Sequence, residues 1–150
     1  MYVERAEIMN TIPTNHQWSV HIGCIDGRGV APVQVWAMAK FGVLHVDAIT
    51  QGGMDGFLSS FALEHGDPHE QKATELMRIK RDLFISLEHH KSWPVIVSGH
   101  YACAGNPVSD DEHKKHIRTA CSLVRSWGVP DSVEIIGVFV NSDWQVEKVT

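Results

Sequence analysis

The sequence has no long apolar run, and this bears on where the protein is expected to act. Its first twenty residues include Glu4, Arg5, Glu7 and Pro13, and they never stay apolar for the roughly 7 to 15 positions that a signal peptide needs. No stretch approaches the roughly 18 consecutive apolar residues of a membrane span. The chain has only three cysteines, an odd number that suits a reducing compartment better than a disulfide framework. We therefore expect a cytoplasmic protein.

The chain also lacks a surplus of positive charge. It carries 13 Lys and Arg against 18 Asp and Glu, a formal net charge of -5, and it has no basic run that could follow a phosphate backbone. The glycine-rich patterns GxGxxG and GxxxxGK, which mark the common phosphate-binding loops, do not occur. We expect a small-molecule substrate, and neither nucleic acid nor membrane as a partner.

Length and composition are those of one ordinary globular domain, residues 1–150. The chain is 43% hydrophobic and 21% charged, which is enough to bury a real core. Strands are expected at 18–25, 43–50, 94–98 and 133–141 with an edge strand at 144–149, and helices at about 30–41, 57–63, 70–91 and between Ser109 and Gly128. This alternation predicts an α/β fold, in which a sheet of about four or five strands has a parallel core and helices on both faces.

Two short clusters hold the residue types that zinc prefers. The first is CIDGR, from Cys24 to Arg28, and the second is GHYACAG, which contains His100 and Cys103. Zn²⁺ favours thiolate sulfur and imidazole nitrogen in a tetrahedron, and a catalytic site leaves the fourth position to water. Cys24, His100 and Cys103 would supply three protein ligands, with Asp26 and Arg28 beside them.

Each cluster follows a predicted strand, the first and the third. If these strands are neighbours whose crossovers lie on opposite faces, their carboxyl ends open the crevice where doubly wound folds bind ligands. Folding would then close the 76 positions that separate Cys24 from His100.

Other metal-binding residue types have simpler interpretations. Cys121 lies among apolar residues of a predicted helix, which favours core packing. His113 and His116 are three apart on the same helix and could share a metal, but the two lysines between them favour a solvated face.

With these residues placed, the chain resembles the β-class carbonic anhydrases, a family marked by Cys-x-Asp-x-Arg after the first strand and His-x-x-Cys after a later one. The likeness covers roughly residues 19–140. It implies zinc held by Cys24, His100 and Cys103, and catalytic roles for Asp26 and Arg28. It also implies reversible hydration of CO₂ to bicarbonate by a zinc-bound hydroxide, and assembly as homodimers or multiples of dimers.

The chain departs from the family pattern in several ways: the interval between the two clusters is longer than usual, the N-terminal arm is short, and two local sequences differ. Ala104 separates the second cysteine from Gly105, and Thr50-Gln51-Gly52-Gly53 stands where the family commonly has Arg-Asn-Ala-Gly. Two other functions therefore stay open. One is hydrolysis of CS₂ or COS on the same zinc ligands, and the other is a zinc-binding homologue without catalytic activity.

The expected ligands also predict a pH dependence. Two thiolates cancel the double charge of zinc, so the bound water should ionise at a higher pH than in a site of three neutral histidines. Activity is therefore expected to rise through the alkaline range. Arg28 would keep Asp26 ionised and hold it off the metal.

Overall fold

Five strands form one sheet in the computed structural model, which describes residues 16–63 and 70–150. The strands are β1 (Trp18–Gly23), β2 (His45–Thr50), β3 (Val95–His100), β4 (Ile135–Val140) and β5 (Val146–Lys148). They lie side by side in the order β2-β1-β3-β4-β5, and all are parallel except β5, which pairs with β4 in the antiparallel sense. The predicted parallel core with an edge strand is confirmed.

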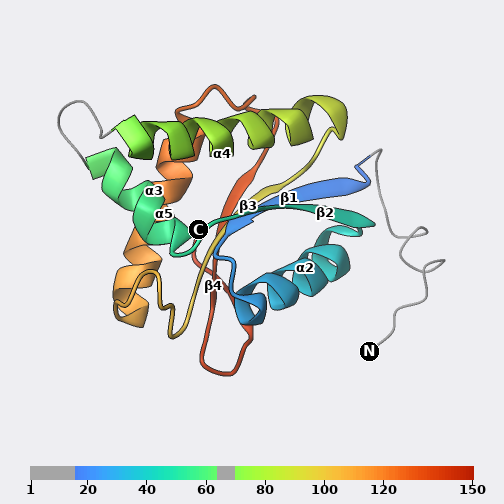
Figure 1. Cartoon of the computed structure of the whole chain (residues 1–150). Coiled ribbons are helices and arrows are strands. Elements are labelled where there is room, and N and C mark those ends of the chain that lie inside the picture. Colours follow the sequence, from blue (N-terminus) through green and yellow to red (C-terminus); the bar gives the residue numbers. More distant parts are fainter. Residues whose placement is uncertain (1–15, 64–69) are drawn as a thin grey trace.

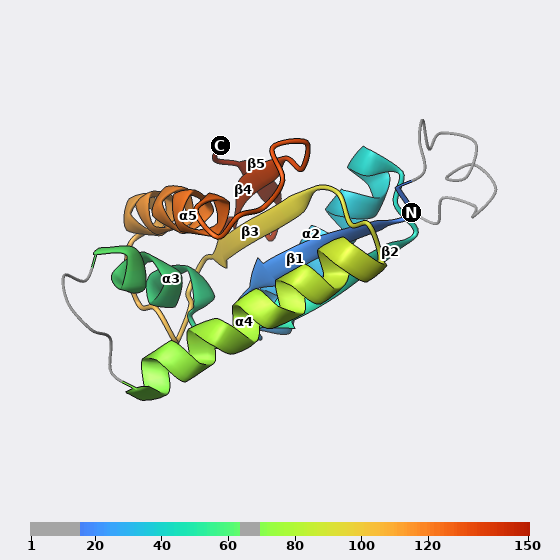
Figure 2. The ribbon, with the colours of Figure 1, turned by 90° about the horizontal axis from the view of Figure 1, so that it is seen from above.

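Helices cover both faces of this sheet. They are α2 (Gly27–Phe41), α3 (Met54–Leu63), α4 (Glu70–His89) and α5 (Asp110–Arg125). Helix α2 lies on one face, and the other three lie on the opposite face (Figures 1 and 2). None of the described helices has both the length and the apolar character needed to cross a membrane.

Each face of the sheet has its own apolar core. Beneath α2, Val33 and Ala37 pack on Ile96 and Val138, while α3, α4 and α5 enclose a larger cluster on the other face. Strand β3 lies between the two cores and is buried at all six positions. Its short apolar sequence therefore reflects burial on both sides, as expected of a central parallel strand.

The connections on the two sides of β1 place the candidate site. The β1 to β2 crossover uses α2, whereas the β2 to β3 crossover uses α3 and α4 on the opposite face. Because β1 pairs with both β2 and β3, its carboxyl end lies where the strand order reverses. This is the position at which open α/β sheets bind ligands.

The predicted helix boundaries are wrong in places, and α2 is the instructive case. It begins at Gly27 and not near Val30, because the Asp26 side chain accepts a hydrogen bond from the backbone N–H of Arg28 and acts as the N-cap. Helix α3 begins at Met54 instead of Phe57. The capping carboxylate therefore belongs to the same short segment as the first cluster.

Candidate metal centre

Three side chains from the two sequence clusters converge at the carboxyl ends of β1 and β3. Cys24 directly follows β1, His100 ends β3, and Cys103 lies in the loop that leaves β3. All three are buried, and their candidate ligand atoms lie within 4.8 Å of one another. We call Cys24, His100 and Cys103 the metal cluster.

The spacing within the metal cluster suits a tetrahedral ion. The Sγ atoms of Cys24 and Cys103 are 3.8 Å apart, far beyond a disulfide bond, and neither residue is in one. Two sulfurs that each lie about 2.3 Å from a tetrahedral Zn²⁺ are also about 3.8 Å apart. Side chains from segments far apart in the sequence are thus held at the separation that one ion would require.

The imidazole of His100 is oriented for coordination. Its Nδ1 donates to the backbone carbonyl oxygen of Tyr101 at 2.8 Å, which leaves the Nε2 lone pair available. This buried Nε2 has no hydrogen-bond partner among the described residues. A buried nitrogen without a partner is unfavourable, and a carbonyl that fixes the other ring nitrogen is typical of metal-binding histidines. Residues at the site therefore fit a metal ion.

Local backbone geometry lets the ligands approach. Ala102 has a φ of 55°, and this left-handed turn allows the chain to bend between His100 and Cys103. Gly29, in the first turn of α2, lies against the imidazole, since an added Cβ would be 3.2 Å from Cδ2 of His100. The helix can therefore begin beside the ring, which brings Asp26 to the same place.

Electrostatics at the thiols also favour a cation. Burial raises the pKa of the Cys103 thiol, and the neighbouring Cys24 adds to this rise. Backbone hydrogen bonds from Asn106 and Gly105 oppose it. Two thiolates at this separation would repel each other in a poorly solvated place, so a divalent cation would stabilise the pair.

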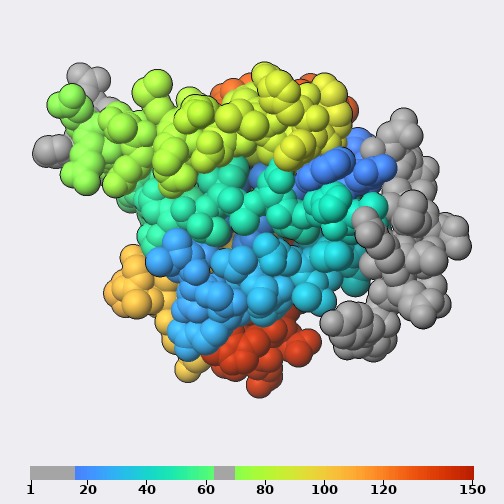
Figure 3. Space-filling model, turned by 45° about the vertical axis from the view of Figure 1, so that its right-hand side comes forward, coloured from blue at the N-terminus to red at the C-terminus, as the bar shows by residue number. Residues whose placement is uncertain are grey.

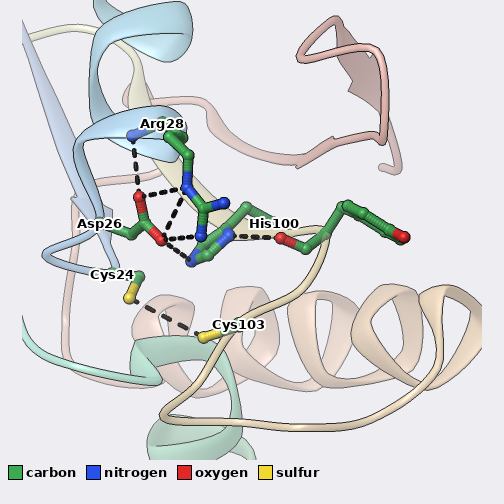
Figure 4. A network of polar contacts seen from close by, with 6 residues as sticks. Cys24, Asp26, Arg28, His100 and Cys103 are labelled. Atoms are coloured by element: carbon green, nitrogen blue, oxygen red, sulfur yellow. Dashed lines mark hydrogen bonds and ion pairs between the residues drawn. The ribbon is translucent and has the colours of Figure 1, made fainter.

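Asp26 and Arg28 form a charged pair beside the metal cluster (Figure 4). Arg28 Nη2 donates to Asp26 Oδ2 at 2.7 Å, and Nε donates to Oδ1 at 3.1 Å. These bonds lower the pKa of Asp26 to about 2. Asp26 Oδ2 lies 4.0 Å from Nε2 of His100. The carboxylate therefore adjoins the metal cluster without belonging to it.

Comparison with known proteins identifies the family. Residues 14–150 match the protein-family model described as "Putative carbonic anhydrase". The chain belongs to this carbonic anhydrase family. A search of curated protein sequences gives no match.

Two solved structures of carbonic anhydrases are similar to the chain at 14% sequence identity. One comes from a study of two tetrameric β-carbonic anhydrases of the filamentous ascomycete Sordaria macrospora, with 95% of this chain and 84% of that chain covered and a TM-score of 0.43. The other is the β-carbonic anhydrase CafA of Aspergillus fumigatus, with 95% and 80% covered and a TM-score of 0.46.

The two local departures of this carbonic anhydrase family member from the expected pattern meet in space. Gly53, which has a φ of 66°, faces the backbone of Gly105, and a Cβ added at Gly105 would lie 2.6 Å from the Gly53 nitrogen. Neither residue can carry a side chain without displacing the other segment. Gly52 and Gly53, at the end of one altered segment, thus make a tight contact with Gly105, which directly follows the other altered position, Ala104.

A second polar cluster joins α3 and α5 to the loop that carries Cys103, and most of its side chains are buried. The sequence analysis missed it. His113 Nδ1 donates to Asp55 Oδ2 at 2.6 Å, and Asn106 Nδ2 donates to Asp55 Oδ1 at 3.0 Å and lies 3.0 Å from Nδ1 of His116. We call Asp55, Asn106, His113 and His116 the carboxylate network. The prediction of a solvated face at His113 is wrong, because its side chain is fully buried.

Cys121 is placed as predicted. It is buried in the larger apolar core, and burial raises the pKa of its thiol to about 12. A thiol that stays protonated at neutral pH is a small apolar side chain, not a metal ligand.

Proposed function

We propose that this protein is a zinc-dependent carbonic anhydrase that catalyses the reversible hydration of CO₂ to bicarbonate. Cys24, His100 and Cys103 would hold the metal, and Asp26 and Arg28 would act beside it. The observation that carries the proposal is the convergence of three ligand atoms at the ends of β1 and β3. Two sulfurs lie 3.8 Å apart, and close to them Nε2 of His100 has no hydrogen-bond partner among the described residues. When bound, zinc supplies Lewis acidity that lowers the pKa of a coordinated water.

Asp26 would orient the attacking water. Its pKa of about 2 keeps it ionised throughout the neutral range, so it can only accept hydrogen bonds. Oδ2, the oxygen nearer to His100, accepts from Arg28 Nη2 at 2.7 Å and from Nε at 3.3 Å. Because Nε also donates to Oδ1 at 3.1 Å, a water could replace the longer Nε contact at Oδ2. A hydrogen bond from the water to Oδ2 would fix the water's rotation and direct its remaining lone pair toward the CO₂ carbon.

Arg28 would hold that carboxylate in place. It contacts both oxygens of Asp26 through its side chain, and planar two-point contacts restrict rotation of the carboxylate. The same contacts would prevent Asp26 from swinging onto the metal cluster and taking the place of water. Arg28→Ala is therefore expected to keep zinc and to lose most turnover, whereas equal loss of both would mean that the arginine is structural.

Metal analysis and stopped-flow CO₂ hydration test the proposal together. We expect zinc in the wild type, and a fall in kcat/KM of about 10²-fold or more in Asp26→Asn at unchanged zinc content. Asparagine keeps an oxygen that can cap α2, so the fold is preserved. Ser109→Ala is the matched control, because it removes the N-cap of α5 away from the site and should leave turnover unchanged. Zinc without turnover at high pH would overturn the catalytic proposal.

Turnover should depend on pH and on the choice among CO₂, COS and CS₂. Cys24 and Cys103 as thiolates would cancel the double charge of the metal, so we expect turnover to rise with pH through the alkaline range. A rate that is flat from about pH 6 to 9 would contradict this. COS and CS₂ assayed beside CO₂ would reveal the alternative hydrolase, which would use the same ligands.

We further propose a cytoplasmic homodimer or a multiple of dimers, as the resemblance to the family implies. None of Cys24, Cys103 and Cys121 is in a disulfide, and thiols that are to bind a metal need a reducing compartment. Light scattering during size-exclusion chromatography would measure the assembly, and a monomer at micromolar concentration would contradict it.

A further inference from the structure

Arg28 has a second contact on its open side. Its side chain is 56% exposed, yet the guanidinium carbon lies over the indole of Trp144, 4.8 Å from the ring centroid. A guanidinium can donate hydrogen bonds from its edge while its face stacks on an aromatic ring. The Trp144 contact is therefore compatible with the two-point contact that Arg28 makes to Asp26.

Trp144 stands in the turn between β4 and β5 with an unfavourable backbone conformation. Its φ is 58°, which costs free energy for a bulky side chain and would cost glycine little. Asn141 holds this turn, since its Oδ1 accepts the backbone N–H groups of Asp143 and Gln145 at 3.0 Å each, and its carbonyl accepts that of Trp144 at 2.9 Å. A large ring kept where glycine would fit better indicates that the ring itself has a role.

The same ring also reaches the other half of the site. Trp144 meets Tyr101 edge to face, with ring centroids 6.3 Å apart, and the backbone carbonyl of Tyr101 is the group that fixes His100. The C-terminal hairpin lies directly against the start of α2 on the molecular surface (Figure 3). One indole thus contacts the residues that orient Asp26 and His100.

We infer that Trp144 is a positioning residue of the metal centre, whose indole face holds the Arg28 guanidinium in the orientation that fixes Asp26. This inference rests on the proposed function for its kinetic consequence. The contact restricts the rotation of an otherwise exposed arginine, so its loss would let Arg28 sample orientations that do not grip the carboxylate. Zinc binding should be unaffected, because the contacts of the Trp144 ring in the described structure are with Arg28 and with the ring of Tyr101, and the carbonyl that fixes His100 belongs to the Tyr101 backbone.

Kinetics of four variants separate positioning from a merely structural role. Trp144→Gly relieves the backbone strain and removes the ring, and we expect it to lower kcat/KM for CO₂ about tenfold at unchanged zinc content. Trp144→Phe keeps an aromatic face and should restore most of the rate. In Arg28→Ala, adding Trp144→Gly should cause no further loss, since the ring acts through the arginine. Independent, multiplying losses would overturn the inference.

Trp127→Ala provides the matched control. Trp127 makes the same kind of contact with Lys80, at 5.5 Å, on the face of α4 and α5, so its loss should leave kcat/KM unchanged. A comparable loss of turnover in this control would show that the effect of Trp144 is general destabilisation.

NMR spectroscopy of Arg28 tests the inference independently of the proposed function. The Trp144 ring should shift the NMR resonance of Arg28 Nε–H in the zinc-loaded wild type. Trp144→Gly should abolish that shift and average the resonance, whereas Trp127→Ala should do neither. If the wild type hydrates no CO₂, the proposed function fails while this result still stands. An Arg28 resonance that is unchanged in Trp144→Gly would refute the positioning role whatever the activity.

Discussion

The metal cluster and the core of the carboxylate network, Asp55, Asn106 and His113, are both buried, and each contains a histidine. The loop between β3 and α5 carries a member of each, Cys103 and Asn106, yet the two clusters differ in what the histidine faces. Nε2 of His100 faces two thiols and has no hydrogen-bond partner among the residues that the structure describes, whereas Nδ1 of His113 donates to the carboxylate of Asp55. A buried imidazole beside soft, unpaired ligands can take up a cation. A buried imidazole beside a carboxylate has its charged partner within the protein at one ring nitrogen, although Nε2 of His113, like Nε2 of His100, has no hydrogen-bond partner among the described residues. What distinguishes the two sites is the pair of thiols, and the carboxylate pairing of His113 stabilises the fold instead.

Removing a ligand from the metal cluster should have the largest effect. A serine hydroxyl is a poor substitute for a thiolate, so Cys103→Ser is expected to weaken zinc binding by more than about 10³-fold and to abolish turnover. Metal analysis after dialysis checks this. Cys121→Ala is the matched control, because Cys121 is a buried cysteine of the core and its loss should leave the zinc content unchanged. Stoichiometric zinc in Cys103→Ser would remove Cys103 from the ligand set.

Breaking the carboxylate network should affect stability far more than metal binding. Asp55→Ala leaves His113 and Asn106 buried without their acceptor, and we expect the free energy of unfolding to fall by about 3–5 kcal/mol. Asp82→Ala, which removes an exposed ion pair with Arg78, should cost less than about 1 kcal/mol. Chemical denaturation with a zinc chelator present measures both. Equal losses would show that the network contributes no more than a surface pair.

A third buried histidine sharpens the comparison, because it faces a neutral group. His21 Nε2 lies 2.6 Å from the Ser98 hydroxyl, and burial lowers the pKa of His21 from 6.5 to about 4. Between these values the unfolded chain binds more protons than the folded one, so stability is complete above about pH 6.5 and falls as the pH drops toward 4. The expected loss is up to about 3 kcal/mol.

His21→Gln tests this explanation. Glutamine cannot be protonated, so the variant should lose that part of the pH dependence between pH 7 and 4, whatever its stability at neutral pH. Denaturation curves of the two proteins across this range, again with chelator, give the comparison. Identical slopes would mean that other groups cause the acid sensitivity.

The sequence was sufficient to place the metal cluster but not the carboxylate network, and the reason is physical. Cys24 and His100 follow apolar strands, and parallel strands bring their carboxyl ends to one edge, so the topology alone predicted that they meet. Asp55 and His113 are 58 positions apart on two helices. No regular hydrogen-bonding pattern joins two helices, and only their packing brings these side chains together.

One signal in α5 could nevertheless have placed His113 correctly. The buried residues of this helix are His113, Ile117, Ala120, Cys121 and Val124, which form a single stripe at helical spacing. His113 continues that apolar stripe toward the N-terminus, whereas the neighbouring lysines lie on other faces. Periodicity was therefore a better guide to its burial than the charge of adjacent residues.

Asn106 is the residue that connects the two clusters, and it should show the smallest effect. Its backbone N–H donates to the Cys103 thiol, while its side chain donates to Asp55. In Asn106→Ala the backbone donor remains but is no longer anchored, so we expect the zinc dissociation constant to rise about tenfold, the lower end of what supporting residues contribute. Competition with a chelator of known affinity measures this constant.

Ser109→Ala separates that effect from a general loss of stability. Removing this N-cap should cost about 1 kcal/mol, similar in order to the loss of the two side-chain contacts of Asn106, with Asp55 and His116, in Asn106→Ala. In the described structure the Ser109 side chain contacts neither cluster and accepts a hydrogen bond from the backbone N–H of Glu112. Zinc affinity should therefore fall only in Asn106→Ala. If both variants weaken zinc binding equally, the effect of Asn106→Ala comes from overall stability alone, and the Asn106 anchor makes no specific contribution to the metal cluster.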